Sequence, residues 1–110
     1  MTTSFLDPAA IAAFRPDKMA KADLAQGGRL FLGINCFEQG QAQAVHTHPG
    51  ADKFYFIVYG KARMTVGEET RTAEAGTVVW APADVPHGVE EALERTVMLV
   101  GMAPPPSRVI

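Results

Sequence analysis

The sequence predicts a single all-β domain, a sandwich or a barrel, preceded by a short helix. First, seven short apolar or alternating runs follow one another between residues 29 and 102. Second, glycine, proline and polar residues separate these runs at near-regular intervals, without intervening helical patterns. Third, a chain of 110 residues has room for one domain, and its 47% hydrophobic residues supply a core that a closed barrel can bury.

The N-terminal segment is the one helix that we expect. Asp7 is a suitable N-cap, and Pro8 suits the first helical position. Pro16 ends the helix, because proline disfavours the helical conformation of the residue before it. We therefore expect a helical segment at about residues 7–15, whereas residues 17–26 show no clear pattern.

The barrel is expected at about residues 29–102, followed by a proline-rich tail at residues 103–110. The predicted strands lie at residues 29–38, 42–48, 54–59, 61–66, 77–81, 87–91 and 96–102. In the fourth of these, apolar and polar residues alternate, so Ala62, Met64 and Val66 should face the core.

The run at residues 54–59 is apolar on both faces of the expected strand. In a small barrel no further layer is available to cover the outer face. An uncovered apolar face of this kind is typical of a contact with another protein. We therefore predict a homodimer.

Composition and charge exclude several classes of function. Ten basic and twelve acidic residues give a net charge of −2, and no basic run is present, so we expect no nucleic-acid binding. Membrane binding is not expected either, because there is no cationic amphipathic helix and no apolar run of about 18 residues. Cys36 is the single cysteine and cannot form an internal disulfide. With no recognisable signal peptide, we expect a cytoplasmic protein.

The three histidines, His46, His48 and His87, are candidate metal ligands. His46 and His48 are two residues apart, so on a strand both side chains project from the same face. Neutral imidazole is a good ligand for Zn, Fe, Ni, Cu and Mn. A histidine pair alone is also common as ordinary surface or core residues, so the surrounding sequence has to decide.

The sequence around His46 and His48 resembles the first motif of the cupin superfamily. That motif runs glycine, five residues, His-x-His, three or four residues, glutamate, six residues, glycine. The chain matches it from Gly40 to Gly60, except that Lys53 stands at the glutamate position.

The second cupin motif runs glycine, five residues, proline, x, glycine, two residues, histidine, three residues, asparagine. The chain matches it from Gly76 to Glu91, with His87 at the histidine, Asp84 at the second glycine and Glu91 at the asparagine. Together the motifs span residues 40–91. The resemblance implies a cupin-type double-stranded β-helix, a jelly-roll barrel.

The resemblance also implies a divalent transition metal (Fe, Ni, Zn or Mn) held by His46, His48 and His87. Lys53 opposes this, because two unit charges about 4 Å apart interact by about 4 kcal/mol at an effective dielectric constant near 20, and a divalent ion doubles that. Three arrangements are open. Asp52 enters as a fourth ligand through a bulged strand start, or the three histidines act alone, or the metal is absent and the pocket binds an anion.

Lys53 and Tyr55 are expected to line the pocket, and Trp80 is expected either to line its mouth or to fill the barrel. The fold alone does not name a reaction. One class of function is a metal-dependent enzyme, an oxygenase, isomerase or lyase acting on a small oxygenated substrate. The alternative is a non-catalytic module that binds or senses a small molecule, with or without metal. In both cases the expected partners are a small molecule and a second copy of the chain.

Overall fold

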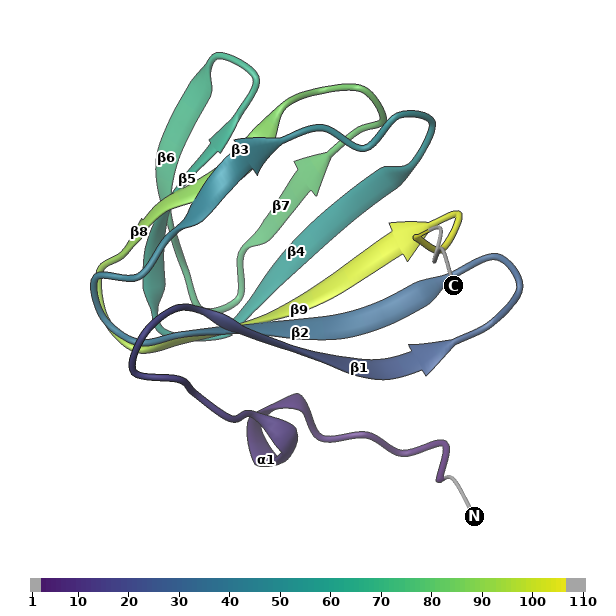
Figure 1. The fold of residues 1–110 in the computed structure, drawn as a ribbon, viewed down its shortest axis with the longest axis horizontal. Helices are drawn as coiled ribbons and strands as arrows, with labels where there is room; N and C mark the ends of the chain where they lie inside the picture. The colour runs from purple at the N-terminus through teal and green to yellow at the C-terminus, as the bar shows by residue number, and fades with distance from the viewer. Residues whose placement is uncertain (1–2, 107–110) are drawn as a thin grey trace.

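The structure, a computed structural model, describes residues 3–106 (Figure 1). In this part of the chain the helix α1 (Pro8–Ile11) precedes nine strands. The strands are β1 (Ala20–Gln26), β2 (Phe31–Phe37), β3 (Gln43–His46), β4 (Asp52–Tyr59), β5 (Lys61–Val66), β6 (Glu69–Glu74), β7 (Val78–Ala81), β8 (His87–Ala92) and β9 (Thr96–Ala103). The predicted all-β class is confirmed. No helix among the described residues is both long and apolar enough to cross a membrane.

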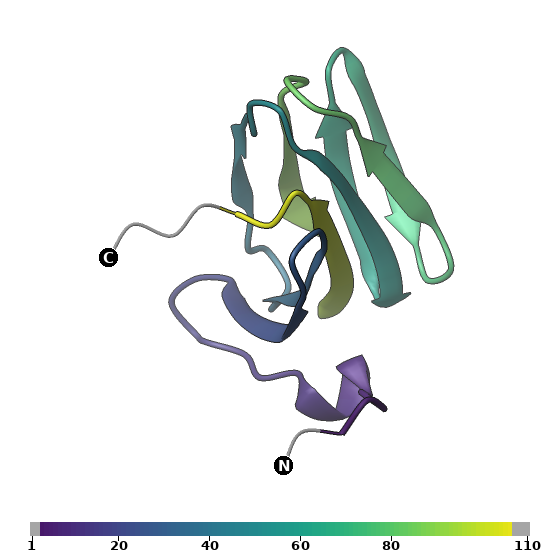
Figure 2. The same ribbon diagram turned by 90° about the vertical axis from the view of Figure 1, so that its right-hand side faces the viewer.

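The strands form two antiparallel sheets that face each other (Figures 1 and 2). The five-stranded sheet has the order β1-β2-β9-β4-β7, and the four-stranded sheet has the order β3-β8-β5-β6. Strands adjacent in sequence, such as β3 and β4, lie in opposite sheets, so the chain crosses repeatedly between the layers. This is the arrangement expected of a jelly-roll barrel.

Two strands lie where the sequence predicted none. β1 occupies the segment without a clear pattern, and it joins the sheet as an edge strand beside β2. β6 has the sequence Glu-Thr-Arg-Thr-Ala-Glu and lies at one edge of the four-stranded sheet. Five of its six residues are exposed there, so the strand needs no alternation of apolar and polar residues. The helix is shorter than the expected segment at residues 7–15. Asp7 caps it as predicted, by accepting hydrogen bonds from two backbone N–H groups.

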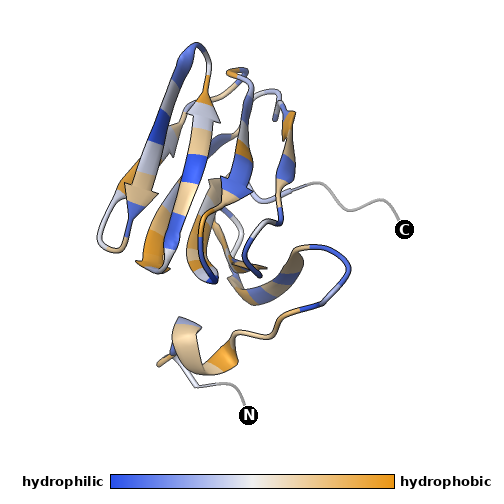
Figure 3. Ribbon diagram, turned by 90° about the vertical axis from the view of Figure 1, so that its left-hand side faces the viewer, coloured by the Kyte–Doolittle hydropathy of each residue, from blue (hydrophilic) through white to orange (hydrophobic). Residues whose placement is uncertain are grey.

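The main core lies between the two sheets. Successive side chains of a strand point to opposite faces, so one set points inward. Along some of the strands hydrophilic and hydrophobic residues alternate accordingly (Figure 3). Ala62 and Met64 are buried as predicted, whereas Val66 is only half-buried. Burying one large apolar side chain contributes roughly 1.5–3 kcal/mol. The largest buried apolar residues of this core are Phe37, Tyr55, Ile57, Val89 and Met98.

A second, smaller cluster lies on the outer face of the five-stranded sheet. Ile34, Cys36 and Val97 are buried there, and Phe14 of the N-terminal segment packs against them. The guanidinium of Arg95 lies 4.0 Å from the centre of the Phe14 ring. Cys36 is thus a core residue, and burial raises the pKa of its thiol. The N-terminal segment therefore covers part of this outer face.

Candidate metal centre

Strands β3 and β8 bring two of the histidines together. His46 and His87 are direct partners in the antiparallel ladder. Gly88 allows this close approach, because a Cβ atom at this position would lie 2.9 Å from both the Gln43 carbonyl oxygen and the Val45 Cα. His48 follows β3 after one further residue. The three imidazoles thus come from one edge of the four-stranded sheet.

The three rings form a compact cluster. The ring centroid of His46 lies 4.8 Å from that of His48 and 4.4 Å from that of His87, and the centroids of His48 and His87 are 5.4 Å apart. One ring nitrogen from each histidine lies within 4.8 Å of the others. His87 is 1% exposed, while the other two rings are half-buried. The sequence-predicted trio is therefore brought together.

Backbone carbonyls fix the tautomer of two rings. His46 Nδ1 lies 2.8 Å from the Ala44 oxygen, and His87 Nδ1 lies 3.0 Å from the Val85 oxygen. A carbonyl oxygen only accepts, so Nδ1 must carry the hydrogen, and in the neutral ring Nε2 keeps its lone pair. Within residues 3–106, Nε2 of His87 and of His48 is buried without a hydrogen-bond partner. Metal-binding histidines have this arrangement, a carbonyl on one nitrogen and a free lone pair on the other.

Burial lowers the pKa of all three imidazoles, because a charged ring loses more hydration than a neutral one. The effect is largest for His48, whose pKa falls to about 4 through burial and, next, the charge of Lys53. The rings are therefore neutral at pH 7. Metal ligation requires neutral imidazole, so the donor set fits a divalent transition metal.

Lys53 points into this cluster. It is 5% exposed, with its Nζ 3.4 Å from His46 Nε2 and 4.8 Å from the centre of the Tyr55 ring. Its neighbours on β4 alternate in burial, which places Lys53 on the inner face with Tyr55 and Ile57. Burial, followed by the charge of Lys21, lowers the pKa of Lys53 to about 8. Its ammonium therefore stays largely protonated at pH 7.

Asp52 is not brought to the histidines. Its side chain is exposed, and Oδ1 accepts a hydrogen bond of 2.9 Å from the Ala83 N–H. The expected alternative needed a bulge at the start of β4, but here Asp52 and Lys53 pair regularly with Ala103 and Met102 of β9. Consecutive residues of a regular strand face opposite ways, so the inward position of Lys53 turns Asp52 outward.

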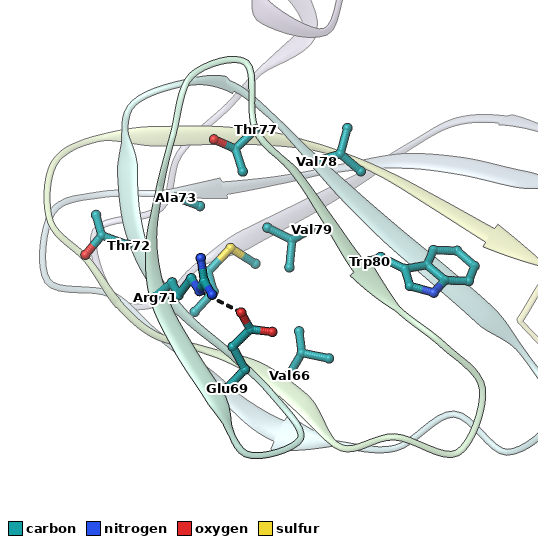
Figure 4. A pocket seen from close by; sticks show the side chains of 10 residues that line it. Val66, Glu69, Arg71, Thr72, Ala73, Thr77, Val78, Val79 and Trp80 are labelled. Carbon is teal, nitrogen blue, oxygen red and sulfur yellow. Dashed lines mark ion pairs between the residues drawn. The ribbon is translucent and has the colours of Figure 1, made fainter.

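Tyr55 and Trp80, the other expected pocket residues, lie in different places. Tyr55 is fully buried with its ring 6.1 Å from the His87 ring, and its hydroxyl makes a long hydrogen bond of 3.5 Å to Gln43. Burial raises the pKa of this hydroxyl above its usual value. Trp80 is 55% exposed and lines a cavity of about 490 Å³ between β6 and β7 (Figure 4). No histidine lines that cavity.

A cavity of about 410 Å³ adjoins the candidate centre, because His48 and Lys53 line it. Lys21 and Asn35 also line it, and the sequence did not single out either residue. Lys21 lies in the segment where the sequence showed no pattern. Asn35 interrupts an apolar strand as a buried polar residue, which is the only sequence signal that could have drawn attention to it.

Asp84, which replaces a glycine of the second motif, takes the left-handed conformation that glycine favours, with φ of 70°. Its carboxylate accepts a 3.2 Å hydrogen bond from the Gly50 N–H, and its own N–H donates to the His48 oxygen at 3.3 Å. Asp84 thus ties the loop before β8 to the turn after His48. These bonds offset part of the backbone strain.

Comparison with known proteins agrees with this architecture. The sequence model of the cupin domain matches residues 33–101. The crystal structure of TT1209 from Thermus thermophilus superposes with a TM-score of 0.88 at 37% identity, covering 94% of this chain and all of that one (100%). An uncharacterized protein of Streptomyces coelicolor, SCO3923, is 32% identical over 104 residues, which are 86% of this chain and 98% of its own.

KdgF from a Halomonas species shares the fold at 21% identity, with a TM-score of 0.82 over 96% of this chain and 97% of its own. The match to the cupin domain covers more than half of the chain and includes all three histidines. The histidine cluster joins His46 and His48 of the first motif with His87 of the second. The chain belongs to the cupin family.

Proposed function

We propose that this cupin holds a divalent transition metal on His46, His48 and His87 and binds a small molecule at the metal's remaining positions. The observation that carries the proposal is the pair of buried Nε2 atoms of His48 and His87 beside the His46 ring, which have no hydrogen-bond partner among the described residues. A buried polar atom without a partner costs about 1–3 kcal/mol. A metal ion shared by the three rings would remove that cost.

A bound metal would act as a Lewis acid toward an oxygen-containing ligand, and a redox-active ion would also support oxygenase chemistry. The chain supplies the remaining features. The carbonyls of Ala44 and Val85 orient the His46 and His87 rings. Lys53 supplies a positive charge next to the ligands. An oxygenase or isomerase would turn over a substrate placed there, whereas a sensing module would bind it unchanged.

The test is metal binding by tag-free protein. We expect one equivalent of metal after purification, or on titration of chelator-treated protein with Zn²⁺, Mn²⁺, Ni²⁺ or anaerobic Fe²⁺. Loss of a group that hydrogen-bonds to a metal ligand weakens metal binding by up to about 100-fold, and loss of the ligand itself costs at least as much. His46→Ala and His87→Ala should therefore weaken metal binding at least about 100-fold. Asp52→Asn is the matched control and should bind metal as the wild type does, since its amide oxygen still accepts from Ala83.

Two results would contradict the proposal: no stoichiometric binding of any of these ions, or undiminished binding by both histidine variants.

The contact between Lys53 Nζ and His46 Nε2 favours a second candidate, a metal-free module that binds a small molecule. In that case the ammonium donates to the imidazole in place of a metal. The same titration separates the two candidates, and turnover of bound compounds separates an enzyme from a sensing module.

We further propose that the cupin is a homodimer through the outer face of β4 and β7. Val78 is 61% exposed and Trp80 55%, and Phe54 and Phe56 beside them are only half-buried. The second cluster, which includes Phe14, packs against Val58, and neither Phe54 nor Phe56 belongs to it. Light scattering at micromolar concentration should give twice the chain mass, 11.8 kDa.

Trp80→Glu should halve the mass measured for the dimer. The matched control is Val45→Glu, because Val45 is equally exposed, at 56%, but belongs to the other sheet. A monomeric wild type, or an equal effect of both substitutions, would show that this face is not the interface.

A further inference from the structure

The cavity beside the candidate metal centre carries more positive than negative charge. Among residues 3–106 its charged lining residues are Lys21, Lys53 and Asp23, two ammonium groups against one carboxylate. His48 also lines the cavity and belongs to the histidine cluster. A molecule in this cavity therefore lies within reach of both lysines and the candidate metal ligands.

The strand register places these donors on one face. Lys21 is the partner of Asn35 in the β1–β2 ladder, and side chains of directly opposite residues leave the same face. Lys53 pairs with Met102 of β9, which in turn pairs with Phe31 of β2. Phe31 and Asn35 are four residues apart on β2, an even spacing, so they share that face. All of these side chains thus point toward the four-stranded sheet.

The two most buried of these donors lack an anionic acceptor. Asn35 is 4% exposed, and its Nδ2 has no hydrogen-bond partner among the described residues. Lys53 is 5% exposed and forms no ion pair with any carboxylate of residues 3–106. Its ammonium has three hydrogens, and His46 Nε2, at 3.4 Å, accepts one of them. A buried charge without an opposite partner is costly, which favours an anionic ligand.

The size and walls of the cavity point to an organic ligand. About 410 Å³ is within the range of sites for small organic molecules and exceeds what a single inorganic anion would fill. Phe31, Val100 and Met102 contribute apolar surface that a short carbon chain can contact.

We propose that the cavity binds a small hydroxycarboxylate, with its carboxylate held by Lys53 and Lys21 and a hydroxyl oxygen accepting from the Asn35 amide. The inference builds on the proposed function, because the ligand lies against the candidate metal centre. Recognition of the carboxylate depends on the lysines and is therefore measurable without metal.

The test is calorimetric titration of chelator-treated protein with matched pairs of compounds. Gluconate is compared with sorbitol, and lactate with propane-1,2-diol, since each pair differs in the carboxylate. We expect at least one acid to bind, and its neutral counterpart to bind at least about tenfold more weakly, because charge-assisted hydrogen bonds are the stronger class. Equal binding within both pairs, or no binding of either acid at millimolar concentration, would overturn the proposal.

Variants then locate the binding site. Lys53→Met should lower the affinity for the acid at least about tenfold and leave the neutral compound unaffected. Lys21→Gln should lower it by a smaller factor, because Lys21 is exposed. The matched control is Lys18→Gln, which removes an exposed lysine outside the cavity. If the acid binds all three variants as it binds the wild type, the site lies elsewhere and the proposal fails.

The two proposals fail in distinguishable ways. Selective binding of the acid by a protein that takes up no metal would support this inference and remove the metal centre. Stoichiometric metal binding without selectivity for either acid would support the metal centre and remove this inference. The comparison of wild-type binding between acid and neutral compound needs no variant, so it holds even if Lys53→Met does not fold.

Discussion

Replacing Lys53 with methionine should stabilise the metal-free protein at neutral pH. Methionine keeps a similar length and removes the buried charge. Burial and Lys21 lower the pKa of Lys53 from 10.5 to about 8. One pKa unit corresponds to about 1.4 kcal/mol, so the charged amine costs about 3 kcal/mol of folding free energy below pH 8.

The pH dependence distinguishes this cost from a change in packing. Between pH 8 and 10.5 the unfolded chain still binds the Lys53 proton, whereas the folded chain has released it. Stability contributed by this group therefore rises with pH across that window. The wild type should approach the stability of Lys53→Met as the pH reaches 10.5.

The assay is urea unfolding of both chelator-treated proteins at several pH values, with the free energy extrapolated to water. The difference between variant and wild type is the quantity of interest, because it cancels the other titrating groups. We expect that difference to shrink by about 3 kcal/mol between pH 8 and 10.5. Parallel curves across this window would refute the reasoning that Lys53 is charged, buried and unpaired.

Lys53→Glu places the carboxylate of the first cupin motif beside the histidines. Equilibrium titration should show metal binding at least about tenfold tighter than in the wild type, because a repulsive charge becomes attractive. Unchanged affinity would mean that this side chain does not face the metal. Gly88→Ala should weaken metal binding and destabilise the fold by about 1–3 kcal/mol, since the added Cβ meets the backbone of β3; full metal affinity and stability would contradict that contact. Metal-free protein should lose stability as the pH falls from 6.5 toward 4, because His48 takes up its proton at a higher pH in the unfolded chain than in the folded one. In chemical unfolding at several pH values, the free energy of unfolding of His48→Gln should fall less steeply with decreasing pH. Asp84→Gly should stay within about 1 kcal/mol of the wild type in thermal unfolding, as relief of strain offsets the lost hydrogen bond, whereas Asp84→Val should be clearly less stable.

The sequence predicted those strands in which apolar and polar residues alternate, and it contains the two cupin motifs in the expected order. Alternation at Lys61–Val66 was informative because one face of β5 meets the core and the other does not. It failed for β6, whose exposed edge position needs no apolar residues. It also failed for β1, where the half-buried side chains are only two alanines and Leu24, so that the apolar alternation is weak.

For the site, the resemblance to the two cupin motifs identified His46, His48 and His87 and the anomaly of Lys53. It left open which of Asp52 and Lys53 faces the histidines, because a bulge of one residue exchanges the two faces of a strand. The regular pairing of β4 with β9 decided that question in favour of Lys53. Lys21 and Asn35 entered the site only through the β1–β2 register, since residues distant in sequence meet through pairing that no local pattern encodes.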